Sequence, residues 1–207
     1  MLLYYITDRK QFPGDENSRR RALLAKIAEA ARCGVDFIQL REKDLSSRQL
    51  EALAQDAVRT VRENSARTRL LINSRTDLAL ACRAHGVHLR SEDVLPSAVR
   101  AAWRHSLSSA PAITVSCHSP AEVAGAAAET ADFAVFAPVF EKQGASAAGL
   151  DALRAACAHP IKVLALGGVT LENARACVEA GAAGVAGIRL FQENEVSRVV
   201  GALRDEG

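Results

Sequence analysis

Short apolar runs alternate with amphipathic stretches from one end of the chain to the other. Most of the runs are continuous Val, Ile and Leu rather than apolar residues alternating with polar ones, which is typical of parallel strands buried on both faces. The runs predict eight strands, at Leu2–Thr7, Phe37–Arg41, Leu70–Asn73, Gly86–Leu89, Ile113–Cys117, Phe133–Phe140, Val163–Gly167 and Gly184–Leu190.

Longer stretches with helical periodicity lie between the predicted strands. They include Arg19–Ala31, Arg48–Glu63, Pro120–Glu129, Leu150–Ala158 and Leu171–Ala180. Several follow a Ser or Thr that suits a helix N-cap, namely Ser18, Ser47, Ser119 and Thr170. The pattern is therefore a repeated strand–helix unit.

Eight such units predict a (β/α)8 TIM barrel in which residues 1–207 form one domain. A chain of 207 residues, 49% of them hydrophobic, is large enough to bury that core. A doubly wound open sheet is the alternative. The number of units and the lack of a GxGxxG sequence after the first strand favour the closed barrel.

Composition narrows the class of partners. The net charge is only +2, from 26 basic and 24 acidic residues, so a nucleic-acid partner is not expected. The five cysteines are far apart and form no CxxC pair, which argues against disulfides and zinc and favours a reducing cytoplasm. The first residues do not resemble a signal peptide, and no apolar run is long enough to predict a membrane partner.

Polar residues follow most of the predicted strands, where a barrel builds its active site. Gln39, Arg41 and Lys43 come at the end of the second strand, and two cations beside a glutamine suit a phosphorylated substrate. Gly167 and Gly168 end the seventh strand, where glycine lets the backbone approach a phosphate. Other strand ends of this kind are Asn73–Arg75, Arg90–Asp93, Ser116–His118, Glu141–Gly144 and Gly187–Arg189.

Seven short motifs lie in order along the chain, at Gln39–Lys43, Ile72–Arg75, Gly86–Leu89 with Glu92–Asp93, Ser116–His118, Pro138–Phe140, Leu166–Val169 and Gly184–Ala186. In residues and in order they resemble the thiamine phosphate synthase and TenI superfamily, over nearly the whole chain. The resemblance implies a (β/α)8 barrel and one of two activities that share a thiazole phosphate site.

The first activity, our main hypothesis, is that of a transferase of thiamine biosynthesis. The synthase joins hydroxymethylpyrimidine pyrophosphate to thiazole phosphate and expels pyrophosphate with Mg²⁺. By similarity, Arg41 and Lys43 would be catalytic residues that contact the pyrophosphate and pyrimidine, Ser116 would lie near either group, and Asp93 would hold Mg²⁺. The residues expected to bind the substrates are Gln39, Asn73, Arg75, Lys142, Gly167, Gly168, Gly187 and Ile188.

The chain also departs from the synthase pattern. Ser74 stands where synthases usually have an Asp that is a second Mg²⁺ ligand, and Arg90 replaces a usual glycine. The loop after the sixth strand is shorter and lacks the family threonines, so Lys142 matches the family lysine only if two residues are deleted. Because Mg²⁺ needs only one or two carboxylates plus substrate phosphates, Asp93 could still hold it, with weaker binding.

The second activity is that of a TenI-type thiazole tautomerase, which moves one proton to make the thiazole aromatic. In these proteins a histidine in a Ser-x-His-Ser segment has that role, and His118 in Ser116–Ser119 matches it. A third hypothesis is a homologue that binds phosphate without turnover. Dimers are common in barrels of this size, so a homodimer is also expected.

Simpler interpretations compete for several of these residues. Arg41 and Lys43 could form an exposed charged turn with Glu42 and Asp44. His88 lies within an apolar strand and is expected to be a core histidine with satisfied hydrogen bonds. Two further alternatives are Asp93 as the cap of the next helix, and Cys117 as a packing residue.

Overall fold

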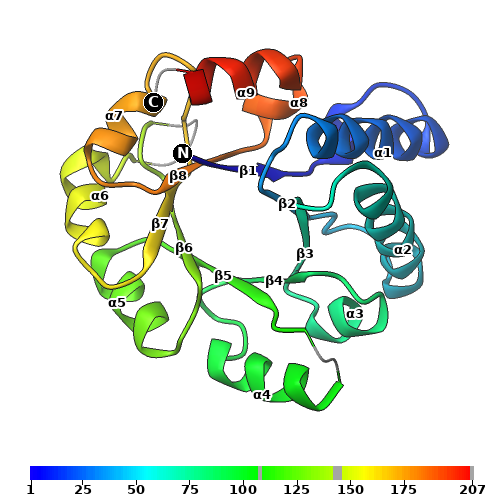
Figure 1. Cartoon of the computed structure of the whole chain (residues 1–207), viewed down its shortest axis with the longest axis horizontal. Helices are drawn as coiled ribbons and strands as arrows, with labels where there is room; N and C mark the ends of the chain where they lie inside the picture. The colour runs from blue at the N-terminus through cyan, green and yellow to red at the C-terminus, as the bar shows by residue number, and fades with distance from the viewer. Residues whose placement is uncertain (107–108, 142–145, 206–207) are drawn as a thin grey trace.

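In the computed structural model of the protein, eight parallel strands close into a barrel that is surrounded by helices (Figure 1). The structure describes residues 1–106, 109–141 and 146–205. Each strand pairs with its neighbours in sequence, and β1 pairs with β8 to close the ring. The predicted (β/α)8 barrel is therefore confirmed, and the open doubly wound sheet is excluded.

All eight strands lie where the apolar runs predict them. Their bounds are β1 Leu2–Ile6, β2 Phe37–Leu40, β3 Arg69–Asn73, β4 Gly86–Leu89, β5 Ala112–Cys117, β6 Phe133–Phe136, β7 Lys162–Ala165 and β8 Gly184–Gly187. Most of their residues are fully buried, as expected for strands covered on both faces.

The helices form the outer layer. Their bounds are α1 Glu16–Arg32, α2 Ser47–Asn64, α3 Thr76–Ala81, α4 Pro96–Ser106, α5 Pro120–Ala128, α6 Gly149–Cys157, α7 Ala174–Glu179, α8 Arg189–Gln192 and α9 Val196–Asp205, with a short 3₁₀ helix η1 at Arg9–Gln11. Among the described residues, no helix has both the length and the hydrophobicity to cross a membrane.

Five predicted strands extend too far at their carboxyl ends, by one or two residues for the first, second and seventh and by more for the sixth and eighth. The sixth was predicted to reach Phe140, but β6 ends at Phe136, just before Ala137 and Pro138. Proline has no N–H to donate to a neighbouring strand, so the sheet cannot continue through it. The eighth was predicted to reach Leu190, but β8 ends at Gly187 and the chain then winds into α8.

The predicted helix caps are correct at one position and displaced at the others. Ser119 caps α5, and its side chain accepts a hydrogen bond from the Glu122 amide. Asp15, rather than Ser18, caps α1. Ser46, rather than Ser47, caps α2 in a capping box with Gln49. Asn173, rather than Thr170, is the N-cap of α7. Apolar periodicity places a helix but does not fix which nearby polar residue caps it.

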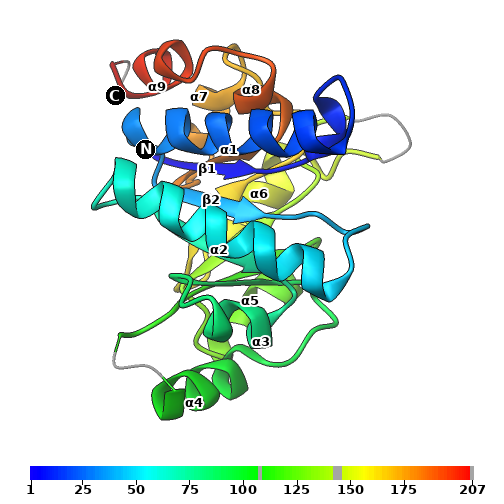
Figure 2. The same cartoon turned by 90° about the vertical axis from the view of Figure 1, so that its right-hand side faces the viewer.

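Two apolar layers hold the barrel together. Side chains pointing into the barrel form the inner layer, which contains Tyr4, Phe37, Leu71, Val135 and Leu164. Side chains pointing outward pack under the helices in a larger layer. Figure 2 shows α1 and α2 lying across β1 and β2, whose arrowheads point the same way. The strand ends that carry polar residues therefore share one rim.

Candidate active site

Predicted site residues from neighbouring strands meet at the carboxyl-terminal rim of the barrel. Gln39 on β2 and Asn73 at the end of β3 are in direct contact, because the Gln39 amide donates to Asn73 Oδ1 at 2.8 Å. Gln39 is 1% exposed. Its Oε1 is a buried acceptor with no hydrogen-bond partner among the described residues. An unpaired buried acceptor costs about 1–3 kcal/mol, which a ligand that donates a hydrogen bond would remove.

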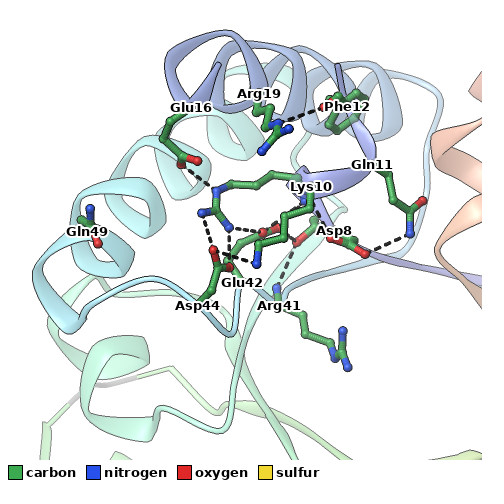
Figure 3. A network of polar contacts seen from close by, with 12 residues as sticks. Asp8, Lys10, Gln11, Phe12, Glu16, Arg19, Arg41, Glu42, Asp44 and Gln49 are labelled. Atoms are coloured by element: carbon green, nitrogen blue, oxygen red, sulfur yellow. Dashed lines mark hydrogen bonds and ion pairs between the residues drawn. The ribbon is translucent and has the colours of Figure 1, made fainter. Parts of the chain in front are cut away.

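A buried ion-pair network fixes the loop after β2 (Figure 3). Glu42 accepts hydrogen bonds from Thr7 Oγ1 at 2.7 Å and from the Arg9 amide and Nη1 at 3.1 Å. Arg9 also donates to both oxygens of Asp44, at 2.7 and 2.9 Å, and to Glu16 at 2.7 Å. Burial raises the pKa of Glu42 against these hydrogen bonds, whereas the hydrogen bond from Arg9 holds the pKa of Asp44 well below its usual range. The network is a structural anchor.

Arg41 and Lys43 do not join that network. The Arg41 amide donates to Thr7 Oγ1 at 3.0 Å, but its guanidinium points away from Glu42 (Figure 3). Within the described part of the chain, no hydrogen bond or ion pair engages the side chain of Arg41 or Lys43. The pKa of Lys43 is lowered, first by the charge of Arg41 and then by burial and Arg90. Crowded cations without a carboxylate are typical of an anion-binding site.

The alternative in which Arg41 and Lys43 form a charged turn with Glu42 and Asp44 is therefore wrong. Both carboxylates bind Arg9 instead. The two acidic residues face η1 and α1, and the cations are left for the rim.

Asp93, the predicted metal ligand, lies in the loop after β4 and is bound by Arg90. The Arg90 amide donates to Asp93 Oδ2 at 2.8 Å, and Nη2 and Nε donate to Oδ1 at 3.0 and 3.2 Å. Burial raises the pKa of Asp93, but hydrogen bonds from Arg90 and Ser74 outweigh it and keep the pKa below its ordinary value. The carboxylate is charged and already partnered on both oxygens.

These donors do not fit a resident Mg²⁺ site. Mg²⁺ takes oxygen ligands, and proteins usually bind it through one or two free carboxylates together with substrate phosphates. Among residues 1–106, 109–141 and 146–205 no three His, Cys, Asp or Glu side chains are grouped so that they could hold a metal. Ser74 has no carboxylate, and Asp93 would have to give up Arg90 to bind an ion.

A chain of hydrogen bonds runs inside the barrel and ends at Ser116. His88 on β4 lies 2.8 Å from Ser116 Oγ through Nε2 and 2.8 Å from Thr114 Oγ1 through Nδ1. Tyr4 OH is 3.2 Å from the same Nδ1. Burial, helped by the charge of Arg41, lowers the pKa of His88 to about 3, so the ring is neutral. The expected core histidine is confirmed, and it also orients a predicted site residue.

His118 follows β5 and is exposed at the rim. Its Nδ1 lies 2.8 Å from the Ala137 carbonyl oxygen. Because a carbonyl only accepts, Nδ1 must carry the proton, and Nε2 of the neutral ring is then the basic nitrogen. The neighbouring Cys117 is fully buried, and burial raises the pKa of its thiol to about 12, which confirms a packing role.

The predicted phosphate-binding glycines adopt conformations that other residues avoid. Gly167 and Gly168 have φ values of 93° and 67°. A Cβ at either position would lie 2.7 Å from an atom of Pro138 or Phe140 in the loop after β6. Glycine is thus required here by the backbone and by close contact with that loop. Gly187 ends β8 and Ile188 precedes α8, so all four residues lie at the rim.

One predicted substrate contact, Arg75, is not brought into this group. The guanidinium of Arg75 donates to Asp77 at 2.6 and 2.9 Å and to Ser47 Oγ at 3.0 Å, which ties it to α2 and α3. Lys142 lies outside the described residues. The other predicted residues occupy the rim, and their roles in binding stay predictions.

No role was predicted from the sequence for the groups that hold the rim in place. Arg9 has no predicted function, although it binds three carboxylates. The one available signal was the alternation of charge in Arg41–Asp44. The contact between His88 and Ser116 had a weaker signal in the sequence. His88 is the third residue of its predicted strand and Ser116 the fourth of the next one. Only the pairing of β4 with β5 brings the two side chains together.

Comparison with known proteins agrees with this geometry. The family model described as thiamine monophosphate synthase matches residues 3–191. A protein of Geobacter sulfurreducens, provisionally named thiamine-phosphate synthase, is 44% identical over 89% of this chain and 83% of its own length. The thiamine-phosphate synthase of Syntrophomonas wolfei is 36% identical over 89% of this chain and 85% of its own.

A solved structure gives the same result. The thiamine phosphate pyrophosphorylase of Pyrococcus furiosus superposes with a TM-score of 0.82 at 28% identity, and the match covers 99% of this chain and 94% of that one. Sequence and fold agree over the same residues that carry the rim. The chain belongs to the thiamine monophosphate synthase family.

Proposed function

We propose that the chain is a thiamine-phosphate synthase, a transferase that joins hydroxymethylpyrimidine pyrophosphate to thiazole phosphate. The observation that carries the proposal is the pair of cations, Arg41 and Lys43, which have no partner within the described residues and follow β2, the strand that carries the unpaired Gln39 acceptor. Similarity to relatives named for this activity supports it.

The synthase reaction needs positive charge around a departing pyrophosphate, and Arg41 and Lys43 carry positive charge at this rim. The bond between the pyrimidine methylene carbon and the pyrophosphate oxygen breaks, and both electrons leave with the pyrophosphate. The thiazole nitrogen then gives its lone pair to the cationic carbon. Fixed positive charges around the departing oxygens stabilise the transition state, and a strong acid or base is not needed. We assign this task to Arg41 and Lys43.

Neutral groups would hold the two substrates. Gln39 Oε1 would accept a hydrogen bond from the pyrimidine, and Asn73, which fixes the Gln39 amide, would add a polar contact. Ser116 Oγ, held by His88, would lie near the pyrophosphate or pyrimidine. The backbone at Gly167, Gly168, Gly187 and Ile188 would bind the thiazole phosphate.

The experiment is incubation of the purified protein with both phosphorylated substrates, while pyrophosphate and thiamine phosphate are followed together. The proposal expects the two products in equal amounts, and none when either substrate is left out. Absence of both products, with the protein shown to be folded, would refute the proposal.

The tautomerase is the second candidate because of His118. With Nδ1 donating to the Ala137 carbonyl, Nε2 is placed to accept and return a proton. Two results together would establish this activity instead. The unaltered protein would isomerise the thiazole without releasing pyrophosphate, and His118→Ala would lose the isomerisation. A protein that binds the substrates and does neither would be the binding homologue. The homodimer and the cytoplasmic location stay predictions.

A further inference from the structure

Arg90 binds Asp93, the residue that the family resemblance predicts as the metal ligand. Its amide, Nε and Nη2 all donate to Asp93, between 2.8 and 3.2 Å. The Asp93 side chain is 11% exposed, whereas that of Arg90 is 60% exposed. The carboxylate is fixed in the loop, and the guanidinium that covers it extends into solvent and can turn toward a ligand.

Ser74, at the end of the neighbouring strand β3, is the second departure from the family's metal site. It follows Asn73 with a φ of 57°, and its hydroxyl stabilises the charged form of Asp93. A hydroxyl adds no negative charge, so the Asp93 carboxylate is balanced by the Arg90 guanidinium alone. The other carboxylate that acts on Arg90 belongs to Glu92, which is exposed to solvent and therefore screened.

Arg90 belongs to the same group of cations as Arg41 and Lys43. The charges of Arg41 and Arg90 both lower the pKa of Lys43, and the three residues follow β2 and β4 at the same rim. Only Arg90 among the three has a carboxylate partner in the described part of the chain. The excess positive charge that a divalent cation would bring to pyrophosphate is thus already present in side chains.

We propose that Arg90 takes the place of the divalent cation, so that this chain binds pyrophosphate without Mg²⁺. Guanidinium pairs with phosphate oxygens through two parallel hydrogen bonds, which suits it to this task. The inference rests on the proposed function, because it concerns the pyrophosphate that the reaction releases.

The test is calorimetric titration of inorganic pyrophosphate into the protein, in EDTA and again in Mg²⁺ with the magnesium pyrophosphate complex taken into account. For the unaltered protein we expect dissociation constants within about threefold of each other. Arg90→Gln should weaken binding in EDTA by at least about tenfold. Arg154→Gln is the matched control, because Arg154 also pairs with an Asp three residues away and is 62% exposed. It should change binding less than twofold.

The converse variant restores the missing carboxylate. Ser74→Asp combined with Arg90→Gly should bind pyrophosphate poorly in EDTA and at least about tenfold more tightly in Mg²⁺. Asp tolerates the positive φ of position 74. A thermal melt of each variant shows that it is folded.

Three results would overturn the inference. They are binding by the unaltered protein only in Mg²⁺, unchanged binding by folded Arg90→Gln, and equal binding of the double variant in EDTA and Mg²⁺. Each leaves the proposed function standing if both substrates still give thiamine phosphate. No pyrophosphate binding in either solution, together with no product, would overturn both proposals.

Discussion

Two arginines on neighbouring strand ends have opposite surroundings. Arg9 follows β1, and its side chain is 4% exposed and paired with Glu16, Glu42 and Asp44. Arg41 follows β2, and within the described residues its guanidinium has no partner. Both lie on the same rim and are equally charged at neutral pH.

The difference separates groups that build the rim from groups that wait for a ligand. The network around Arg9 satisfies its charges internally, so it fixes the backbone of Arg41–Asp44 and offers little to a substrate. Arg41 and Lys43 are presented by that fixed backbone and repel each other. An anion would relieve the repulsion, whereas a further cation would increase it.

The largest expected effect comes from breaking the structural side of this comparison. Arg9→Met keeps the length of the side chain but removes the cation that pairs with buried Glu42, so the free energy of unfolding should fall by about 3–5 kcal/mol. Denaturation in urea measures the loss. Lys10→Met is the control, since Lys10 is 58% exposed and forms an ion pair, among the residues that the structure describes, only with Asp44; it should cost less than about 1 kcal/mol. Equal losses in the two variants would contradict the distinction.

The next effect comes from breaking the ligand-binding side. Arg41→Ala should lower kcat/KM for pyrophosphate release about 10²–10³-fold, because a fixed cation at the leaving group is lost. The free energy of unfolding should stay within about 0.5 kcal/mol, since no described residue depends on that guanidinium. Arg67→Ala, an exposed arginine before β3, should leave both quantities unchanged. A large loss of stability in Arg41→Ala would mean that Arg41 is structural after all.

The smallest predicted effect is the contribution of His88 to the pH dependence of the free energy of unfolding. Its pKa is about 3 when folded and rises to the ordinary 6.5 on unfolding, because burial and the charge of Arg41 oppose protonation. Below pH 6.5 the unfolded state therefore binds more protons, and stability falls as pH falls, by at most about 1.4 kcal/mol per pH unit from this group.

The control for this prediction removes the titrating group. His88→Gln should show a shallower dependence of the free energy of unfolding on pH between about 4.5 and 6.5, measured in urea at each pH. His85, whose pKa is also lowered by burial, contributes equally in both proteins and cancels from the difference. The same slope in both proteins would show that His88 is protonated in the folded state.

The barrel and most of its rim could be predicted because they follow from local patterns. Continuous apolar runs identify buried strands, and parallel strands that alternate with helices bring their carboxyl ends together. Gln39, Asn73 and Ser116 were expected at the rim for that reason, and their strands place them there. Strand ends were less certain, as the extension past Pro138 shows, because an apolar run does not reveal where pairing stops.

Which charged side chains form ion pairs could be learned only from the folded structure. The sequence alone determined the fold class, the family resemblance and the residues that follow each strand. It could not show that Glu42 and Asp44 pair with Arg9, or that Arg90 holds Asp93, since an ion pair depends on distances of a few ångströms between segments and on burial. Hydrophobic periodicity is written along the chain, whereas charge pairing depends on the folded arrangement of side chains.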